Sequence, residues 1–252
     1  VDALVHVVRC FEDKDITHVS GAVDPKSDIE IIETELILAD LESVEKQFDK
    51  LAKKAKGGDK DAAKQQELAH RLKEHLGKGL PARSAGLDAD DLLLVREFFL
   101  SSSKPVLYAM NVAEGDLPGM DNAFTKAVQA IAKAEGALAI PICAKIEAEL
   151  GEMEPADALD FLKELGLQEP GLNRLIHAGY DLLGLQSYYT AGPQEARAWT
   201  IKKGAKAPEA AGEIHSDIQR GFIKAEIMGY KDLESKDGDE KVLKDAGLLR
   251  QE

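Results

Sequence analysis

The sequence has few cysteines and no long apolar run. Its two cysteines, Cys10 and Cys143, cannot form a disulfide framework or a four-thiolate metal site, so we expect a reduced, cytoplasmic setting. No stretch approaches the roughly 20 apolar residues that a membrane-spanning helix requires. The opening residues do not have the form of a signal peptide. We therefore expect no membrane partner.

Positive charge is also scarce. The 252 residues carry a net charge of −14, which argues against a protein that is basic all over and coats nucleic acid, and we expect no DNA specificity. Hydrophobic residues make up 44% of the chain, which argues against wholesale disorder. The length suggests one large domain or two to three small ones.

The sequence also has no initiator methionine. It opens directly on an apolar segment, residues 1–11, which is typical of a buried strand without a lead-in. We therefore expect a longer parent protein whose N-terminal part precedes Val1.

A helical hairpin is predicted next. Residues 28–55 form one long helical pattern, with Ser27 as N-cap and Glu30 completing a capping box. Glycines at 57 and 58 break this helix, and a second helix follows over residues 60–76. The short turn favours an antiparallel pair. The expected apolar seam consists of Ile37, Leu41, Val44, Phe48 and Leu51 facing Leu68, Leu72 and Leu76.

Strands and helices alternate after the hairpin, as in a parallel α/β sheet with the hairpin inserted after its first strand. The expected elements are a helix over 87–100 capped by Asp88, strands over 104–110 and 137–143, and helices over 121–135 and 145–150. Further helices are expected over 156–165 and 171–183. Strands over 187–191, 196–201 and 223–230, with a helix over 207–215, indicate a small α+β module.

The expected tip of the hairpin is basic. Five lysines face one acid, Asp59, between residues 50 and 60: Lys50, Lys53, Lys54, Lys56 and Lys60. They form either a solvated helix end that complements the helix dipole or a contact with a phosphate backbone.

Ligands of parallel α/β proteins bind at the carboxyl ends of the strands. Two such ends carry polar groups here, at Asn111-Val112-Ala113-Glu114 and at Cys143-Ala144. An amide and a carboxylate together offer the donors and acceptors that read a purine edge. Asn-x-x-Glu is a weak pattern by itself, and a strand-to-loop turn capped by Asn111 is the structural alternative.

Other catalytic patterns are missing from the sequence. The phosphate-binding pattern Gly-x-x-x-x-Gly-Lys-Ser/Thr does not occur, because the one Gly-Lys pair, Gly77-Lys78, has Leu72 at its upstream position. The histidines do not form a metal constellation, and His70 and His75 are expected at the surface. By composition alone, His18 is an ordinary loop histidine after the first strand.

The chain as a whole resembles the YchF subfamily of Obg-related P-loop NTPases. The segments that carry this resemblance occur in the same order along nearly the whole chain: residues 6–11 (HVVRCF), 34–41 (TELILADL), 54–60 (KAKGGDK), 169–174 (EPGLNR), 190–192 (TAG), 197–200 (RAWT), 214–217 (IHSD) and 221–226 (GFIKAE).

The resemblance implies three parts. Residues 1–27 and 87–165 would be a partial G domain, and residues 28–86 the inserted, coiled-coil-like hairpin. A connecting helix over 166–185 would lead to a C-terminally incomplete TGS module of the β-grasp type over 186–252.

The resemblance also implies the chemistry. Family members hydrolyse ATP, and also GTP, with Asn-x-x-Glu in place of the usual guanine-reading motif. Asn111, Val112 lying against the base, Glu114, Cys143 and Ala144 would then bind the base. His18 matches a loop histidine thought to orient or polarise the attacking water.

The partners implied are the ribosome, in particular its large subunit, or RNA. The cofactors are ATP or GTP with Mg²⁺, and the phosphate-binding loop and the Mg²⁺ ligands would lie upstream of Val1. The chain alone is then expected to be inactive, as part of a translation-associated ATPase. A non-enzymatic ribosome- or RNA-binding adaptor is the alternative.

Overall fold

The computed structural model describes residues 1–18, 21–192 and 195–251. The chain divides into two compact units, Val1–Leu182 and Leu183–Glu252. The first unit contains a parallel sheet in the order β1-β2-β3, formed by Leu4–Arg9, Val106–Asn111 and Leu138–Ile142. This confirms the predicted parallel α/β architecture. The middle strand is buried along most of its length, as its continuous apolar run predicts.

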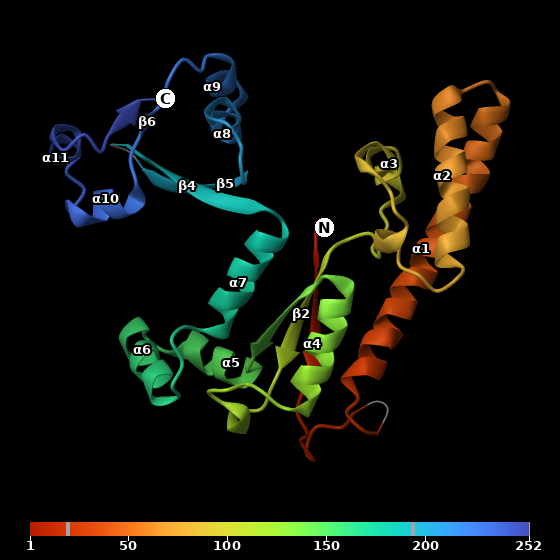
Figure 1. The fold of residues 1–252 in the computed structure, drawn as a ribbon, viewed down its shortest axis with the longest axis horizontal. Helices are drawn as coiled ribbons and strands as arrows, with labels where there is room; N and C mark the ends of the chain where they lie inside the picture. The colour runs from red at the N-terminus through yellow and green to blue at the C-terminus, as the bar shows by residue number, and fades with distance from the viewer. Residues whose placement is uncertain (19–20, 193–194, 252) are drawn as a thin grey trace. The chain divides into compact units, whose positions relative to one another are not determined.

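In the first unit α4 (Ala123–Glu135) follows β2, and α5 (Ala144–Glu152), α6 (Pro155–Glu164) and α7 (Gly171–Leu182) follow β3 (Figure 1). Apolar side chains of α4 and α5 pack with those of the strands in one core cluster. The start of α7 is fixed to α5, because the Glu147 carboxylate accepts from the backbone N–H groups of Gly171 (2.7 Å) and Leu172 (3.0 Å).

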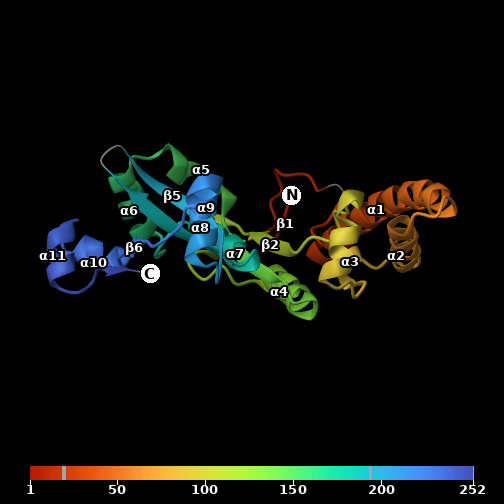
Figure 2. The same cartoon turned by 90° about the horizontal axis from the view of Figure 1, so that it is seen from above.

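The predicted hairpin is present as α1 (Pro25–Lys56) and α2 (Lys60–Leu76), which lie side by side in both views (Figures 1 and 2). We call this pair the arm. Gly58 makes the turn between them at φ +91°, a backbone conformation that favours glycine. The predicted seam is confirmed: Ile37, Val44, Leu51, Leu68, Leu72 and Leu76 are buried, with Leu41 and Phe48 packed beside them.

The predicted start of the first arm helix is wrong. The helix begins at Pro25, and its N-cap is Asp24, whose carboxylate accepts from the backbone N–H groups of Lys26 (3.1 Å) and Ser27 (3.4 Å). Ser27 is therefore inside the helix and makes no capping box with Glu30. Proline at the first helical position, directly after an aspartate, is the stronger start signal.

The helix predicted over 87–100 is interrupted. Asp88 caps a short α3 (Ala89–Leu94), and a 3₁₀ turn, η2 (Arg96–Phe98), follows it. Phe98 and Leu100 are both 3% exposed and pack in the core of the arm. Two residues that are two positions apart point to different sides of an α-helix, so both can be buried here only because the helix ends.

The base of the arm is held to the segment that leads into β2. Asp40 of α1 is 4% exposed, and its carboxylate accepts from Ser101 N (2.8 Å), Ser102 N (2.7 Å) and Ser102 Oγ (2.6 Å). Arg83, in a 3₁₀ turn η1 (Ala82–Ser84), forms ion pairs with Glu33 of α1 and Glu135 of α4. The arm thus joins the sheet domain through buried and half-buried polar contacts.

The second unit contains an antiparallel hairpin of β4 (Leu185–Ala191) and β5 (Ala196–Lys202), on which α8 (Ala207–Ile214) packs. The strand predicted over 223–230 is largely wrong, because only β6 (Glu226–Ile227) forms and pairs with β7 (Arg250–Gln251). The unit is completed by three short helices, α9 (Ser216–Arg220), α10 (Tyr230–Ser235) and α11 (Glu240–Asp245).

No helix in the part of the chain that the structure describes is both long and apolar enough to span a bilayer.

Candidate functional site

The strand register brings the predicted loops to one edge of the sheet. Arg9 pairs with Asn111, and Asn111 pairs with Ile142, so all three strands end at the same level. The loops that follow them carry most of the residues predicted for base binding and catalysis. In parallel α/β proteins this edge is where ligands bind.

Asn111 links two of these loops directly. Its side-chain Oδ1 accepts a 3.0 Å hydrogen bond from the backbone N–H of Ala144, the first residue of α5. This bond fixes the orientation of the amide, because Oδ1 has to face α5. The other end of the amide, Nδ2, is a donor. The structure therefore brings Asn111 and Ala144 together and orders the amide at the edge of the sheet.

Glu114 stands beside the same loop, at the start of a 3₁₀ turn, η3 (Glu114–Asp116). Its Oε2 lies 2.6 Å from Nζ of Lys145, and both side chains are exposed to solvent. This hydrogen bond, together with the carboxylate charge, raises the pKa of Lys145. Sequence reasoning missed Lys145, although it directly follows the predicted Cys143-Ala144 pair.

The side chains of Val112 and Cys143 point away from this edge. Each is 2% exposed and packs in the core cluster of the sheet. Val112 also donates its backbone N–H to Ile142 O at 2.8 Å. The prediction that Val112 lies against a base therefore does not fit the burial of its side chain, which supports the loop from beneath.

The loop after β1 is ordered by Arg9. Its guanidinium donates to the carbonyl oxygens of Phe11 (3.1 Å), Asp13 (3.3 Å) and Ile16 (3.1 Å). The loop then brings His18 against the first turn of α1, where its Nε2 lies 3.0 Å from Oδ2 of Asp28. The sequence gives no sign of this second contact, because it depends on where α1 begins.

The loops after β1 and β2 are also tied together. Asn122 Nδ2 donates to Cys10 O (2.9 Å) and to Asp116 Oδ2 (3.0 Å). Burial, reinforced by the charge of Asp116, raises the pKa of the Cys10 thiol to about 12. Cys10 is therefore a neutral core residue at physiological pH. Within residues 1–18, 21–192 and 195–251, no group of three acidic, histidine or cysteine side chains is arranged to hold a metal ion.

All five predicted lysines of the tip are exposed. They lie in the last turns of α1 and at the start of α2, and no ion pair joins any of them to an acid in the described structure. Lysines further along the arm differ, since Lys46 and Lys73 pair with Glu42 (2.5 Å) and Glu45 (2.9 Å). Asp59, the acid within the tip, is engaged as the N-cap of α2.

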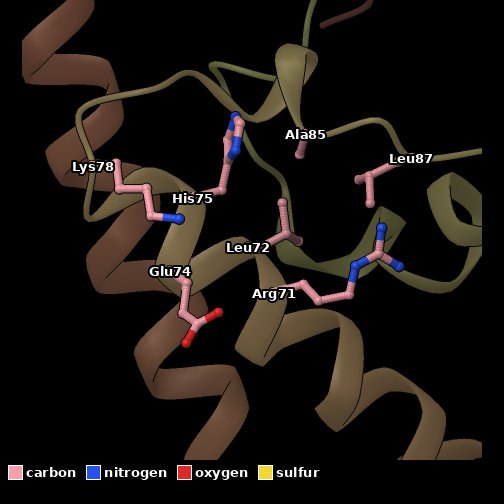
Figure 3. A pocket seen from close by; sticks show the side chains of 7 residues that line it. All are labelled: Arg71, Leu72, Glu74, His75, Lys78, Ala85 and Leu87. Carbon is pink, nitrogen blue, oxygen red and sulfur yellow. The ribbon is translucent and has the colours of Figure 1, made fainter.

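Two hollows lie elsewhere in the first unit. A cavity of about 650 Å³ is lined by Val106, Ala137 and Arg83, near the amino ends of β2 and β3 and thus opposite the predicted edge. A smaller hollow of about 210 Å³ lies at the base of α2 (Figure 3). There His75 is half-buried, contrary to prediction, and its Nε2 contacts Ser84 Oγ at 2.8 Å.

The fold and this edge define the class: a parallel α/β domain of the nucleotide-binding kind, with an inserted helical arm. Comparisons with known proteins give the family. The model YchF-GTPase_C, described as "Protein of unknown function (DUF933)", matches residues 185–252. The "Ribosome-binding ATPase YchF" of Haemophilus ducreyi is 47% identical over 251 residues, which are 100% of this chain and 68% of that protein.

A second relative, the "Ribosome-binding ATPase YchF" of Bacillus subtilis, is 52% identical over 236 residues, 92% of this chain and 64% of that protein. Among solved structures, that of the Schizosaccharomyces pombe YchF GTPase matches with a TM-score of 0.81 and 32% identity, over 100% of this chain and 68% of that one. The chain belongs to the YchF family, as its motifs predict.

Proposed function

We propose that this chain carries the base-binding and water-positioning loops and the ribosome-binding arm of a cytoplasmic ATPase that also accepts GTP. The single observation that carries the proposal is the bond from Ala144 N to Asn111 Oδ1, which orders a base-reading amide at the carboxyl edge of a parallel sheet. The printed names of relatives, as ribosome-binding ATPases, support both the reaction and the partner.

The edge suits adenine better than guanine. With Oδ1 of Asn111 turned to α5, Nδ2 is available to donate to a ring nitrogen of the base. One oxygen of Glu114 is held by Lys145, so the other is the better placed to accept from a single amino group. Adenine offers one amino group, whereas guanine offers two adjacent donors that match a carboxylate with both oxygens available.

We assign to His18 the orientation of the attacking water, a role that an imidazole can fill as a hydrogen-bonding partner. The described residues contain no group of acidic, histidine or cysteine side chains that could hold Mg²⁺. Stabilisation of charge on the phosphates falls to groups outside the residues described above.

The affinities of the protein encoded by the complete open reading frame for ATP and GTP test the base site. Glu114→Gln should weaken ATP binding about 10- to 100-fold, because one charge-assisted hydrogen bond is worth roughly 1.5–3 kcal/mol. Lys145→Ala frees both oxygens and should raise the affinity for GTP relative to ATP. Asp121→Asn is the matched control, since Asp121 is an exposed carboxylate in the same loop, paired with Lys126. An ATP affinity unchanged in Glu114→Gln would refute the assignment.

We assign to the tip lysines a contact with RNA phosphates, which we place on the large ribosomal subunit. The supporting observations are five exposed cations without an acidic partner in the described structure, at the end of a helical arm. Lysine side chains that neutralise phosphates release counterions, so binding of this kind weakens steeply with salt.

Charge reversal tests the arm. Changing Lys53, Lys54 and Lys56 to Glu should weaken ribosome binding and lower the slope of log K against log salt by roughly two to three, at 0.7–0.9 per lost phosphate contact. The control reverses Lys126, Lys133 and Lys163, which are exposed lysines of the sheet domain. Equal effects of the two triple variants would count against a specific role of the tip.

The second unit is also assigned from the resemblance to the family. We assign the second unit to a TGS-type module; in support, α8 covers its hairpin and Tyr188 donates to Ala210 O at 2.7 Å.

The adaptor alternative predicts ribosome binding with no phosphate-binding motif in the complete reading frame. A Gly-x-x-x-x-Gly-Lys-Ser/Thr motif upstream of Val1 would decide for the enzyme.

A further inference from the structure

Asp28 is an acidic group that faces His18. Its Oδ2 lies 3.0 Å from Nε2 of the imidazole, and the two side chains are 24% and 14% exposed. Asp28 is not needed as a helix cap, because Asp24 already accepts from the first N–H groups of α1. We propose that Asp28 is a positioning residue for His18, an inference that rests on the proposed role of His18 in hydrolysis.

The chemistry of the pair fixes the tautomer of the imidazole. An ionised carboxylate can only accept, so Nε2 has to carry the proton that lies between the two groups. Nδ1 then bears the acceptor lone pair of the ring. A carboxylate that holds one ring nitrogen sets both the plane and the proton position of a histidine that works through the other nitrogen.

The residues that follow Asp28 in α1 are packed against the rest of the first unit. The next residue, Ile29, is 3% exposed and packs in the sheet core with Val8 and Cys10. One turn further along α1, Glu33 pairs with Arg83. The turn of α1 that carries Asp28 is therefore anchored to the rest of the first unit by an apolar contact and by an ion pair. His18, by contrast, belongs to a loop that Arg9 orders only as far as residue 16.

Steady-state ATP hydrolysis by the protein that the complete open reading frame encodes tests the proposal in one set of variants. Asp28→Asn should lower kcat about 10- to 100-fold, the loss typical of removing a group that orients a functional histidine, with KM for ATP changed by less than about threefold. Asp28→Glu keeps the charge and should recover part of kcat. Glu30→Gln, an exposed carboxylate in the same helical turn, is the matched control and should hydrolyse ATP normally.

Coupling between the two residues is measured with the double variant. If Asp28 acts through His18, Asp28→Asn combined with His18→Ala should be no slower than His18→Ala alone. Full additivity of the two losses would overturn the proposal, and so would a wild-type kcat in Asp28→Asn. If the wild type hydrolyses ATP but His18→Ala leaves kcat unchanged, the assigned role of His18 fails instead.

A second readout does not depend on hydrolysis. Long-range ¹H–¹⁵N spectra of residues 1–252, recorded at a pH where imidazoles are neutral, report which ring nitrogen carries the proton. The Nε2–H tautomer of His18 should dominate in the wild type and in Glu30→Gln, and it should lose population in Asp28→Ala, which removes the acceptor altogether. An unchanged tautomer ratio in Asp28→Ala would overturn the positioning role even if kcat fell.

Discussion

Replacing Asp40 with alanine should loosen the base of the arm. Asp40→Ala removes the acceptor of three hydrogen bonds, two of which come from Ser102, a residue with 0% exposure. A buried donor without a partner costs about 1–3 kcal/mol. The two buried donors of Ser102 therefore predict a loss of about 2–6 kcal/mol in the free energy of unfolding of the first unit. Asp49→Ala, at an exposed position of the same helix, should cost less than about 0.5 kcal/mol.

Urea unfolding can follow the two units separately. The one tryptophan, Trp199, lies on β5 and reports on the second unit through its fluorescence. Circular dichroism at 222 nm reports mainly on the first unit, which contains the long helices α1 and α2. Asp40→Ala should lower only the midpoint seen by circular dichroism. A loss below about 1 kcal/mol, or an equal loss in Asp49→Ala, would refute the reasoning.

Three further outcomes follow from burial and backbone geometry. Val112→Lys should destabilise the first unit by at least about 3 kcal/mol in urea, because it buries a charge in the core. Cys10 should react with iodoacetamide at pH 8 only on unfolding; its raised pKa means that its stabilising effect is complete below pH 9.0 and is lost as the pH rises toward 12. Gly58→Ala should cost about 1 kcal/mol through its φ of +91°, whereas Gly119→Ala should cost little.

Each of these three predictions has an outcome that would contradict it. A loss of less than about 1 kcal/mol in the free energy of unfolding of Val112→Lys would mean that the side chain reaches solvent. Rapid alkylation of native Cys10 would show that the loop after β1 opens readily. Equal stability of the two alanine variants would show that the positive φ at Gly58 does not penalise alanine.

Apolar spacing predicted most of the first unit. The arm helices and the three strands follow from regular patterns of side chains that are buried on one face or on both. Patterns of this kind are local, because each residue is read relative to its neighbours in the same element. The middle strand is the clearest case, since Val106 through Met110 are all buried.

Breaks in helices and strand pairings that depend on tertiary contacts could not be predicted from the sequence. The break after Leu94 follows from burying both Phe98 and Leu100 against the arm, which the helical pattern of residues 87–100 does not reveal. The strand expected over 223–230 was favoured by its apolar residues, yet Ile223 is 89% exposed. Its real partner is the polar pair Arg250-Gln251, which has no strand-like alternation.

The candidate site divides in the same way. The carboxyl edge could be located from the order of the elements, because parallel strands end together. The contacts within the site could not be predicted from the sequence, because they join residues that are far apart in the chain: Asn111 with Ala144, and Glu114 with Lys145. The resemblance to a family supplied a role for His18, but the carboxylate facing it emerged only from the start of α1 at Pro25.

One helix connects these contacts. In α1 the first turn carries Asp28 against His18, the middle carries Asp40 against the segment leading into β2, and the last turns carry four of the five tip lysines. At 1.5 Å per residue, its 32 residues span about 48 Å without interruption. One uninterrupted helix therefore links the tip of the arm to two places, the loop that holds His18 and the entry to the strand that ends in Asn111. Helices of this kind, together with packed side chains, are among the elements that can carry energetic coupling between distant sites.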